Sequence, residues 1–269
     1  MLPQPRGRFG NEEEVPMKTA IISDLHSNRE ALEAVFEHIR SQDVTRLFCL
    51  GDIVGYGAEP EFCVDLVRGH CEVCLMGNHD EALFRDASDF NPHARGAVEY
   101  TRRIMKPRWY SGNEKKARWR FLGDLPETHA EGRFLFVHGS PRDPVREYVL
   151  PTDGFLNPEK LRLVFDSFEG VALGGHTHHP GIHDESLAFH GLDGEASTTM
   201  EIPSEGKFFI NVGSTGQPRD NDNRACYAIL ESDRVTWHRV PYDYRATMQK
   251  ILDTGELSDL LARRLAIGK

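Results

Sequence analysis

Short apolar runs recur along the chain, and each of them ends abruptly in small and polar residues. The runs are rich in β-branched and aromatic residues and show no regular alternation, which is typical of strands buried on both faces of a sheet. They are KTAIISDLH (18–26), RLFCLGD (46–52), CEVCLMGNHD (71–80), RFLFVHGSP (133–141), GVALGGHTHH (170–179) and KFFINVGSTG (207–216). The pattern predicts six buried strands, each followed by a loop.

Two amphipathic segments separate the first three runs. In NREALEAVFEHIRSQD (28–43), Asn28 is a favourable N-cap, and one helical stripe is formed by Leu32, Val35, Phe36 and Ile39. In EPEFCVDLVRG (59–69), the residues expected to face inward are Phe62, Leu66 and Val67. The first third of the chain therefore predicts a β-α-β-α-β order, which is typical of a parallel sheet with crossover helices.

The second half of the chain has a different pattern. ACYAILE (225–231) and RVTWHRVP (234–241) predict two antiparallel strands, and residues near 243–266 predict C-terminal helices. An α/β fold with a mixed sheet or two packed sheets follows. Residues 1–16 are rich in Pro, Gly and Glu and are expected to form a flexible leader. Residues 17–269 show no repeat or linker and are expected to form one domain.

A basic helical insertion is expected near 90–125. Between Arg95 and Arg120 the chain carries nine basic residues and only two glutamates, with Trp109, Tyr110 and Trp119 interleaved. The segment is either a helical hairpin with a solvated basic face or a lid that brings positive charge toward an anionic substrate.

Composition narrows the class of protein. The formal net charge of -10 argues against a general affinity for nucleic acid or anionic membranes. No apolar run approaches the ~20 residues that span a bilayer, and the N-terminus lacks the apolar core of a signal peptide.

The five cysteines are expected to be reduced thiols of a cytoplasmic protein. Cys71 and Cys74 have the spacing of a zinc or redox motif, but residues three apart on a strand face opposite sides, so structural thiols are expected.

Residues that can bind metal follow five of the six runs. They are Asp24 and His26, Asp52, Asn78 and His79, His138, and His176 and His178. Ligands of α/β proteins bind at the carboxyl ends of strands, so these side chains can converge in one cleft. Carboxylate and imidazole suit Zn, Fe or Mn, and the lack of thiolate argues against a structural zinc site. These ligands are too many for one ion and indicate two ions that share a carboxylate, and Gly174 and Gly175 are expected to let the backbone approach them.

The motifs occur in the order seen in calcineurin-like metallophosphoesterases. They are D-x-H at 24–26, G-D at 51–52, G-N-H-D at 77–80, V-H-G at 137–139 and G-H-T-H at 175–178. The sequence strongly resembles that superfamily, and VGSTGQPRD (212–220) resembles the segment that follows in its bacterial phosphodiesterase-like branch. The resemblance implies a four-layer sandwich of two packed mixed β-sheets flanked by helices, with a dinuclear site between loops.

The resemblance also implies a role for each motif residue. One ion would be held by Asp24, His26, Asp52 and His178. The other would be held by Asp52, Asn78, His138 and His176, so that Asp52 bridges the two ions. His79 would stay unligated and face the substrate. His179 matches no ligand position, and Asp80 is either a support for the site or a helix N-cap.

Hydrolysis of a phosphate ester is the implied reaction. Two divalent cations, with Mn favoured over Fe or Zn, would neutralise the phosphate oxygens and lower the pKa of a bridging water, so that hydroxide attacks the phosphorus. His79 is the expected general acid, with a carboxylate partner that the sequence does not identify.

One motif departs from the Ser/Thr protein phosphatases of this superfamily, which continue G-D-x-x-D-R-G. This chain reads GDIVGYG (51–57), with Gly55 and Tyr56 in the places of the acid and the arginine. The departure favours a small phosphodiester over a phosphoprotein as the substrate. Arg219 is a candidate replacement cation for binding it, or else a partner in a structural salt bridge.

Other functions stay open. A phosphomonoesterase or a Ser/Thr phosphoprotein phosphatase would use the same site. A non-catalytic scaffold of the same fold is expected to lack the histidine of G-N-H-D, which is present here as His79. The expected partner is a small phosphorylated substrate, without nucleic acid or membrane.

Overall fold

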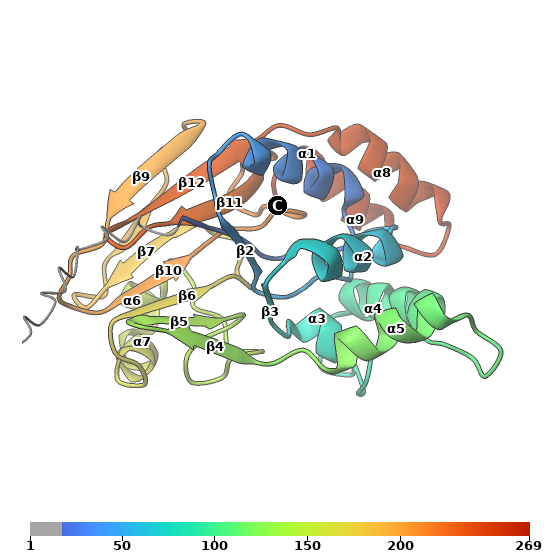
Figure 1. Ribbon diagram of the computed structural model, residues 1–269, viewed down its shortest axis with the longest axis horizontal. Coiled ribbons are helices and arrows are strands. Elements are labelled where there is room, and N and C mark those ends of the chain that lie inside the picture. The colour runs from blue at the N-terminus through green and yellow to red at the C-terminus, as the bar shows by residue number, and fades with distance from the viewer. Residues whose placement is uncertain (1–17) are drawn as a thin grey trace, which may run out of the picture.

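Two six-stranded mixed sheets pack against each other in the computed structural model, which describes residues 18–269 (Figure 1). The α/β class and the pair of mixed sheets predicted from the sequence are confirmed. The leader expected at 1–16 lies outside the described residues.

The first sheet contains both parallel and antiparallel strands. They are β1 (Thr19–Ile22), β2 (Arg46–Cys49), β3 (Val73–Cys74), β9 (Ser197–Glu201), β11 (Ala225–Leu230) and β12 (Arg234–Val240). Their order is β3-β2-β1-β11-β12-β9, in which β1, β2 and β3 are parallel. Ala228 of β11 lies opposite Trp237 of β12, which confirms the predicted antiparallel pair.

The second sheet has a similar plan. Its strands are β4 (Thr128–Glu131), β5 (Phe134–Val137), β6 (Val171–Gly174), β7 (Gly181–Asp184), β8 (Phe189–Gly191) and β10 (Phe208–Asn211). Their order is β4-β5-β6-β10-β7-β8, in which β5, β6 and β10 are parallel. The six apolar runs therefore supply the three parallel strands of each sheet.

Side chains from both sheets form the central hydrophobic core. Ile21 of β1 and Phe48 of β2 meet Phe136 of β5 and Ile210 of β10 there. On the opposite face of β1, Ile22 packs beneath helices. Both faces of β1 are buried, which explains why its sequence is uniformly apolar.

Helices lie on the outer faces of the two sheets and beyond one end of them (Figure 1). They are α1 (Arg29–Arg40), α2 (Pro60–His70), α3 (Asn78–Glu81), α4 (Pro92–Met105), α5 (Asn113–Gly123), α6 (Asp153–Leu156), α7 (Pro158–Phe165), α8 (Tyr244–Asp253), α9 (Asp259–Arg263) and the 3₁₀ turn η1 (Arg264–Ala266). Helix α7 packs Leu161 and Val164 against Phe209 of β10.

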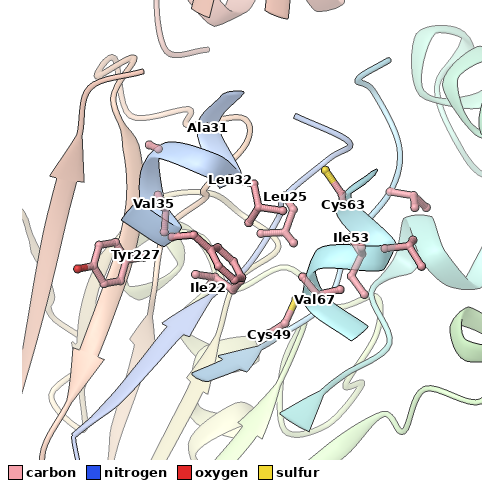
Figure 2. Close-up of a cluster of buried hydrophobic side chains, with 14 of the residues drawn as sticks. Ile22, Leu25, Ala31, Leu32, Val35, Cys49, Ile53, Cys63, Val67 and Tyr227 are labelled. Atoms are coloured by element: carbon pink, nitrogen blue, oxygen red, sulfur yellow. The ribbon is translucent and has the colours of Figure 1, made fainter. Parts of the chain in front are cut away.

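Helix α1 begins where the sequence predicts. The Asn28 side chain accepts a hydrogen bond from the Ala31 amide at 3.1 Å, and the whole predicted stripe is buried. Figure 2 shows Leu32 and Val35 of this stripe in the cluster that contains Ile22 of β1.

Helix α2 confirms the predicted stripe in part: Val67 is in the core, and Phe62 and Leu66 pack against its edge. Cys63 and Val67 are fully buried, whereas Phe62 and Leu66 are half-buried. The guanidinium of Arg29 lies 4.3 Å from the centre of the Phe62 ring. The ring therefore lies at the edge of the core, between apolar side chains and a charged one.

The expectation that Cys71 and Cys74 face opposite sides of a strand is wrong. Strand β3 has only two residues, and Cys71 precedes it as the C-cap of α2. Because the chain bends at Glu72, both cysteines pack on the same hydrophobic cluster. All five cysteines lie within residues 18–269 and are free thiols.

Helices α4 and α5 form a hairpin in the segment of the expected insertion. Arg118 of α5 pairs with Asp65 and Glu61 of α2, and Arg103 of α4 pairs with Glu256. These ion pairs use part of the basic charge of the hairpin to fasten it to the rest of the molecule.

Candidate metal centre

Loops from the parallel strands meet at one edge of the two sheets. Within the second sheet, the amide of Gly175 after β6 donates a hydrogen bond to the carbonyl of His138 after β5 at 2.9 Å. Between the sheets, the amide of Thr215 after β10 donates to the carbonyl of Ser23 after β1 at 2.9 Å. These bonds bring the predicted metal ligands together at the carboxyl ends of the strands.

The backbone at the predicted ligands is strained. Five of the seven have a positive φ: Asp24 (53°), His26 (48°), Asp52 (51°), His176 (64°) and His178 (63°). This conformation costs a non-glycine residue on the order of 1–3 kcal/mol and persists only where the surroundings impose it. Its concentration here indicates a functional site.

Glycines let the loops approach one another. A Cβ on Gly77 would lie 2.1 Å from the amide nitrogen of Asp52, and a Cβ on Gly175 would lie 2.4 Å from the carboxylate of Asp24. Gly174 leaves room for a core phenylalanine ring. These contacts give Gly174 and Gly175 a different role from the expected one, because they accommodate neighbouring side chains and loops.

Asp24, His26 and His178 form a first group of side chains. The Nε2 atom of His178 lies 3.1 Å from Oδ1 of Asp24 and 3.2 Å from Nε2 of His26. Asp52 closes the group, with its Oδ2 atom 3.6 Å from Nε2 of His26. All four residues are buried.

Asn78, His138 and His176 form a second group. The Nε2 atom of His138 lies 3.3 Å from Oδ1 of Asn78 and 3.1 Å from Nδ1 of His176. The same Oδ2 atom of Asp52 lies 3.5 Å from Nε2 of His138. One carboxylate oxygen therefore faces both groups, as a bridging ligand must.

Backbone carbonyls orient all four histidine rings. In each ring, one nitrogen is turned away from the groups and lies near a backbone carbonyl oxygen. The pairs are His26 with Val54 at 3.3 Å, His138 with Leu50 at 3.0 Å, His176 with Arg146 at 3.0 Å, and His178 with Gln217 at 2.5 Å. A carbonyl oxygen only accepts, so these nitrogens carry the protons. Where both rings of a pair are neutral, as for His26 and His178, the inward nitrogens then face each other as lone pairs, here at 3.2 Å. Such lone pairs repel unless a cation lies among them, so the donor set fits metal ions.

Burial keeps three of these rings neutral. It lowers the pKa of His26 and His178 and brings that of His176 to about 3. Burial also opposes protonation of His138, but the nearby Asp52 carboxylate raises its pKa to about 9. A proton on His138 and a metal ion are two ways to balance the buried charge of Asp52.

Comparison with known proteins identifies the family. A model of the "Calcineurin-like phosphoesterase superfamily domain" matches residues 17–234. The chain belongs to this superfamily. It is a metallophosphoesterase, and its buried Asp and His groups are typical of a dinuclear metal site in this family.

Similar proteins occur in archaea and bacteria. The chain is 35% identical over 263 residues to the MJ0912 protein of Methanocaldococcus jannaschii. The match covers 93% of this chain and 98% of that protein. A metallophosphoesterase from Sphaerobacter thermophilus has a crystal structure with 36% identity and a TM-score of 0.79, covering 94% of this chain and 100% of that one. PH1004 from Pyrococcus horikoshii, at 17% identity, shares the fold with a TM-score of 0.72 over 94% of this chain and 99% of that one.

His79 lies beside both groups: one of its ring nitrogens lies within 4.8 Å of ligand atoms of His26 and Asp52, but its ring makes no hydrogen bond with a carboxylate of residues 18–269. Its backbone amide donates to Oδ1 of Asp52 at 2.8 Å, while its Nδ1 atom is buried and has no hydrogen-bond partner in the described part of the chain. A Cβ on Gly55 would lie 2.4 Å from this nitrogen. The glycine that replaces the acid of the protein phosphatases therefore leaves no space for one, and burial lowers the pKa of His79 to about 4.

Asp80 connects two loops of the centre. Its carboxylate accepts hydrogen bonds from the amides of Ile53 at 3.3 Å, Val54 at 3.1 Å and Gly77 at 3.1 Å. Of the two roles left open by the sequence, support of the site applies, because Asp80 holds the loop after β2. The N-cap of α3 is Gly77, and Asp80 lies at the third position of the helix, from which its carboxylate accepts a hydrogen bond from the Gly77 amide. Burial and the Asp52 charge raise its pKa to about 7.

A cavity of about 340 Å³ opens beside the two groups. Asn78, His79 and His176 form its inner wall, and its other lining residues are Tyr56, Arg85, Asp89, Phe90, Asn91, Ala94, Arg146 and Tyr148. None of these comes from the nine basic residues between 95 and 120. Among residues 18–269, the basic segment thus forms a fastened hairpin rather than a lid over this cavity.

Sequence reasoning missed the outer wall of the cavity. Glu81 of α3 accepts hydrogen bonds from Nε of Arg85 at 2.8 Å and from Nε of Arg146 at 3.0 Å. Tyr148 stacks on His176 with the ring centres 3.8 Å apart. No motif surrounds these residues, so only the packing of the loops could reveal them.

Arg219 lies at the edge of the centre. Its Nη2 atom donates to Oε1 of Gln217 at 2.9 Å, and its Nε atom is buried without a partner among residues 18–269. Its charge contributes to the lowered pKa of His79 and His178. His179 lies apart from both groups, with Nδ1 2.8 Å from the carbonyl of Thr177.

Across residues 18–269, no helix has both the length and the apolar character needed to cross a membrane.

Proposed function

We propose that the protein is a dinuclear metal-dependent phosphoesterase that hydrolyses a small phosphodiester. The observation that carries this proposal is the set of four histidine nitrogens that face inward, two of which, from His26 and His138, lie near one shared oxygen of Asp52. Asp24, His26, Asp52 and His178 would hold one ion, and Asp52, Asn78, His138 and His176 the other. When bound, such ions neutralise phosphate oxygens and lower the pKa of a coordinated water.

His79 is the proposed proton donor to the leaving oxygen. It lines the cavity between Tyr56 and Phe90, whose rings lie 4.4 Å and 5.1 Å from its own and limit the access of water. An anionic ester beside the ring raises its pKa from the low value set by burial, so that the ring can carry a proton. Transfer of that proton to the leaving oxygen contributes about 10²–10⁴-fold to the rate.

The size and lining of the cavity favour a small ester. Its volume of about 340 Å³ is in the range of small-molecule sites, and Tyr56, Phe90 and Tyr148 offer aromatic surface to an organic group. Gly55 and Tyr56 replace the acid and the arginine of the protein phosphatases, which disfavours a phosphoprotein substrate.

The proposal is tested by comparing esters and metals. Chelation should abolish hydrolysis of bis(p-nitrophenyl) phosphate, and addition of Mn²⁺ should restore it better than Fe²⁺ or Zn²⁺. Turnover of this diester should exceed that of p-nitrophenyl phosphate and of a phosphopeptide. Faster hydrolysis of either monoester would favour the alternative phosphatase activity. A protein that holds two ions and cleaves none of the three would be a scaffold.

Replacing His79 by alanine tests the proton donor. Turnover of the diester should fall by about 10²–10⁴-fold, while elemental analysis should still find both ions. His70→Ala is the matched control, because this exposed histidine bonds only the Leu66 carbonyl of its own helix. Loss of bound metal in His79→Ala would show instead that His79 is a ligand.

A further inference from the structure

The hairpin of α4 and α5 ends in an exposed aromatic loop. Residues 106–112 connect the two helices and project from one end of the molecule (Figure 1, right). In this loop Trp109 is 89% exposed and Tyr110 is 61% exposed. Tryptophan and tyrosine with this much surface in water are typical of interfaces, where one part of the ring meets an apolar phase and the other stays wet. The hairpin tip is defined here as this loop and the start of α5, residues 106–116.

The positive charge of the hairpin tip is not neutralised by the rest of the chain. The ion pairs of the hairpin within residues 18–269 involve Arg103, Glu114 and Arg118. The four basic residues of the tip have no carboxylate partner in that part of the chain, and they are Lys106, Arg108, Lys115 and Lys116. The last two lie at the start of α5, where the helix dipole is also positive, so an anion is favoured there. Glu114, the acidic residue of the tip, already pairs with Arg68 of α2 at 2.9 Å.

The hairpin behind the tip is fixed to the body of the protein. Met105, at the end of α4, is buried in the core cluster that contains side chains of α1 and α2. Nε of Arg102 donates to the carbonyl of Leu83 at 3.1 Å, and Arg118 of α5 pairs with Asp65 of α2. Because these contacts engage the side chains nearer the body, the tip is held out in solvent with its own side chains free.

A cavity of about 370 Å³ lies beside the tip. Four of its six described lining residues are basic, and they are Arg102, Arg103, Lys106 and Arg108. Glu99 and Pro107 complete the lining. The side chains of Lys106 and Arg108 that reach into this cavity are the unpaired ones, so it suits a phosphate-bearing group next to the exposed rings.

We infer that the hairpin tip binds the surface of an anionic phospholipid bilayer. Tryptophan and tyrosine side chains favour the interface between water and lipid, and lysine and arginine are attracted to anionic headgroups. A projecting loop can enter this soft surface without a groove of matching shape. The inference goes beyond the proposed function and does not depend on it.

The arrangement of the rings disfavours single-stranded nucleic acid as the partner. Proteins that bind it stack successive bases on the faces of aromatic side chains. Trp109 and Tyr110 meet edge to face, at an angle of 87° with their centres 5.5 Å apart, and offer no common stacking surface.

The charge of the whole chain does not describe the hairpin. The formal net charge of -10 underlies the expectation that no membrane is a partner, but residues 102–116 carry six basic residues and one glutamate. Surface charges act over about a Debye length of 8–10 Å, so a bilayer that touches the tip is attracted by these residues more than it is repelled by distant carboxylates.

The hairpin tip and the metal centre lie at opposite ends of α4. Asn91 and Ala94, at its start, line the cavity of the metal centre, whereas the tip follows Met105 at its end. At 1.5 Å per residue the helix separates the two by about 20 Å. Attachment through the tip would therefore leave this cavity open, and substitutions in the tip should not change the metal content.

Binding to vesicles tests the inference without hydrolysis. The full metal-loaded chain is sedimented with vesicles of phosphatidylcholine containing about 30% phosphatidylserine, and with vesicles of phosphatidylcholine alone. Each lysine or arginine near an anionic surface contributes about fivefold in affinity, so the anionic vesicles should bind at least about 25-fold more tightly, with most of the difference lost at high salt. Tryptophan emission should shift to shorter wavelength, because Trp109 is exposed whereas Trp237 is fully buried.

Variants of the tip locate the binding. Trp109→Ala should weaken binding about tenfold or more and abolish the emission shift. Lys115→Gln combined with Lys116→Gln should weaken it about 25-fold. Phe155→Ala is the control for the aromatic change, because Phe155 of α6 is 88% exposed and lies outside the hairpin.

A matched double variant controls for the change of net charge. Arg162→Gln combined with Arg245→Gln removes two exposed arginines of α7 and α8 and should keep the wild-type affinity. Equal binding to the two kinds of vesicle, or tip variants that bind as tightly as the wild type, would overturn the inference. A protein that binds a (Glu)12 peptide or a (dT)12 oligonucleotide but not the anionic vesicles would also overturn it, and would identify a different partner for the tip.

Discussion

The metal centre and the rim of its cavity are built in different ways. Every candidate ligand follows one of the parallel strands, and neighbouring loops fix it through backbone hydrogen bonds and glycine contacts. The rim uses Arg85, Arg146 and Tyr148, which come from helices and connections and are held mainly by side-chain contacts. The centre therefore leaves almost no freedom to its side chains, whereas the guanidinium groups of the rim are held by ion pairs with Glu81. The rim meets the centre at His176, through the Tyr148 ring and the Arg146 carbonyl.

The largest effect should follow a change at Asp52, where the two groups join. Asp52→Asn keeps the shape but removes the charge that faces both His26 and His138. We expect elemental analysis to find less metal at both positions. Diester turnover should fall by more than about 100-fold, because loss of a residue that only supports a metal ligand already lowers activity by up to about 100-fold.

The control for Asp52 is an exposed aspartate. Asp124→Asn, at the C-cap of α5, should retain metal and activity. If Asp52→Asn kept both ions, the bridging assignment would be incorrect and the centre would tolerate more change than its geometry implies.

A smaller effect should come from the glycines that fix the centre. In Gly77→Ala the new methyl group would meet the backbone of Asp52 at 2.1 Å, so the loops must separate. We expect the free energy of unfolding to fall by about 1–3 kcal/mol, as for other overpacked positions, and metal affinity to fall with it. Urea unfolding with and without chelator measures both.

Gly69→Ala is the matched control for this change. Nothing lies within 4 Å of a Cβ at Gly69, which is inside helix α2. Alanine is the better helix former, so this variant should be more stable by up to about 1 kcal/mol. Equal destabilisation by both substitutions would mean that the loops of the centre are not closely packed.

The same contrast explains what the sequence could predict of the fold. Strands β1 and β6 are buried throughout, and β2, β5 and β10 are buried toward their carboxyl ends. Their apolar runs therefore stand out, and the sequence pattern predicts all six parallel strands. Strands β4 and β9 were missed because they lie at sheet edges and alternate exposed with half-buried residues, which resembles loop sequence. The stripe of α2 was predicted only in part, because Phe62 lies at the edge of the core under an arginine from α1, a contact between residues distant in the sequence.

The same contrast separates the site residues that the sequence could predict from those that it could not. Asp24, Asp52 and His138 could be found because strand ends place polar residues after apolar runs, and the structure brings all seven predicted ligands into two adjoining groups. Arg146 and Tyr148 could not be found, because nothing in their local sequence separates them from other surface residues. Their positions follow from how helices and loops pack after the sheets have formed.

The smallest predicted effect concerns the rim. Glu81 is the carboxylate that pairs with Arg146 within residues 18–269, and Arg85 also reaches Asp89 at 3.2 Å. Glu81→Gln should free positive charge beside the cavity and lower the KM for an anionic diester about two- to fivefold, because a partly exposed ion pair is worth up to about 1 kcal/mol. The decrease should shrink at high salt, while kcat and metal content should stay constant. Glu37→Gln, which breaks an exposed pair with Arg40 on α1, should leave the KM unchanged. A rise in KM without salt dependence would show that Glu81 positions the arginines, and the rim would then be as closely constrained as the centre.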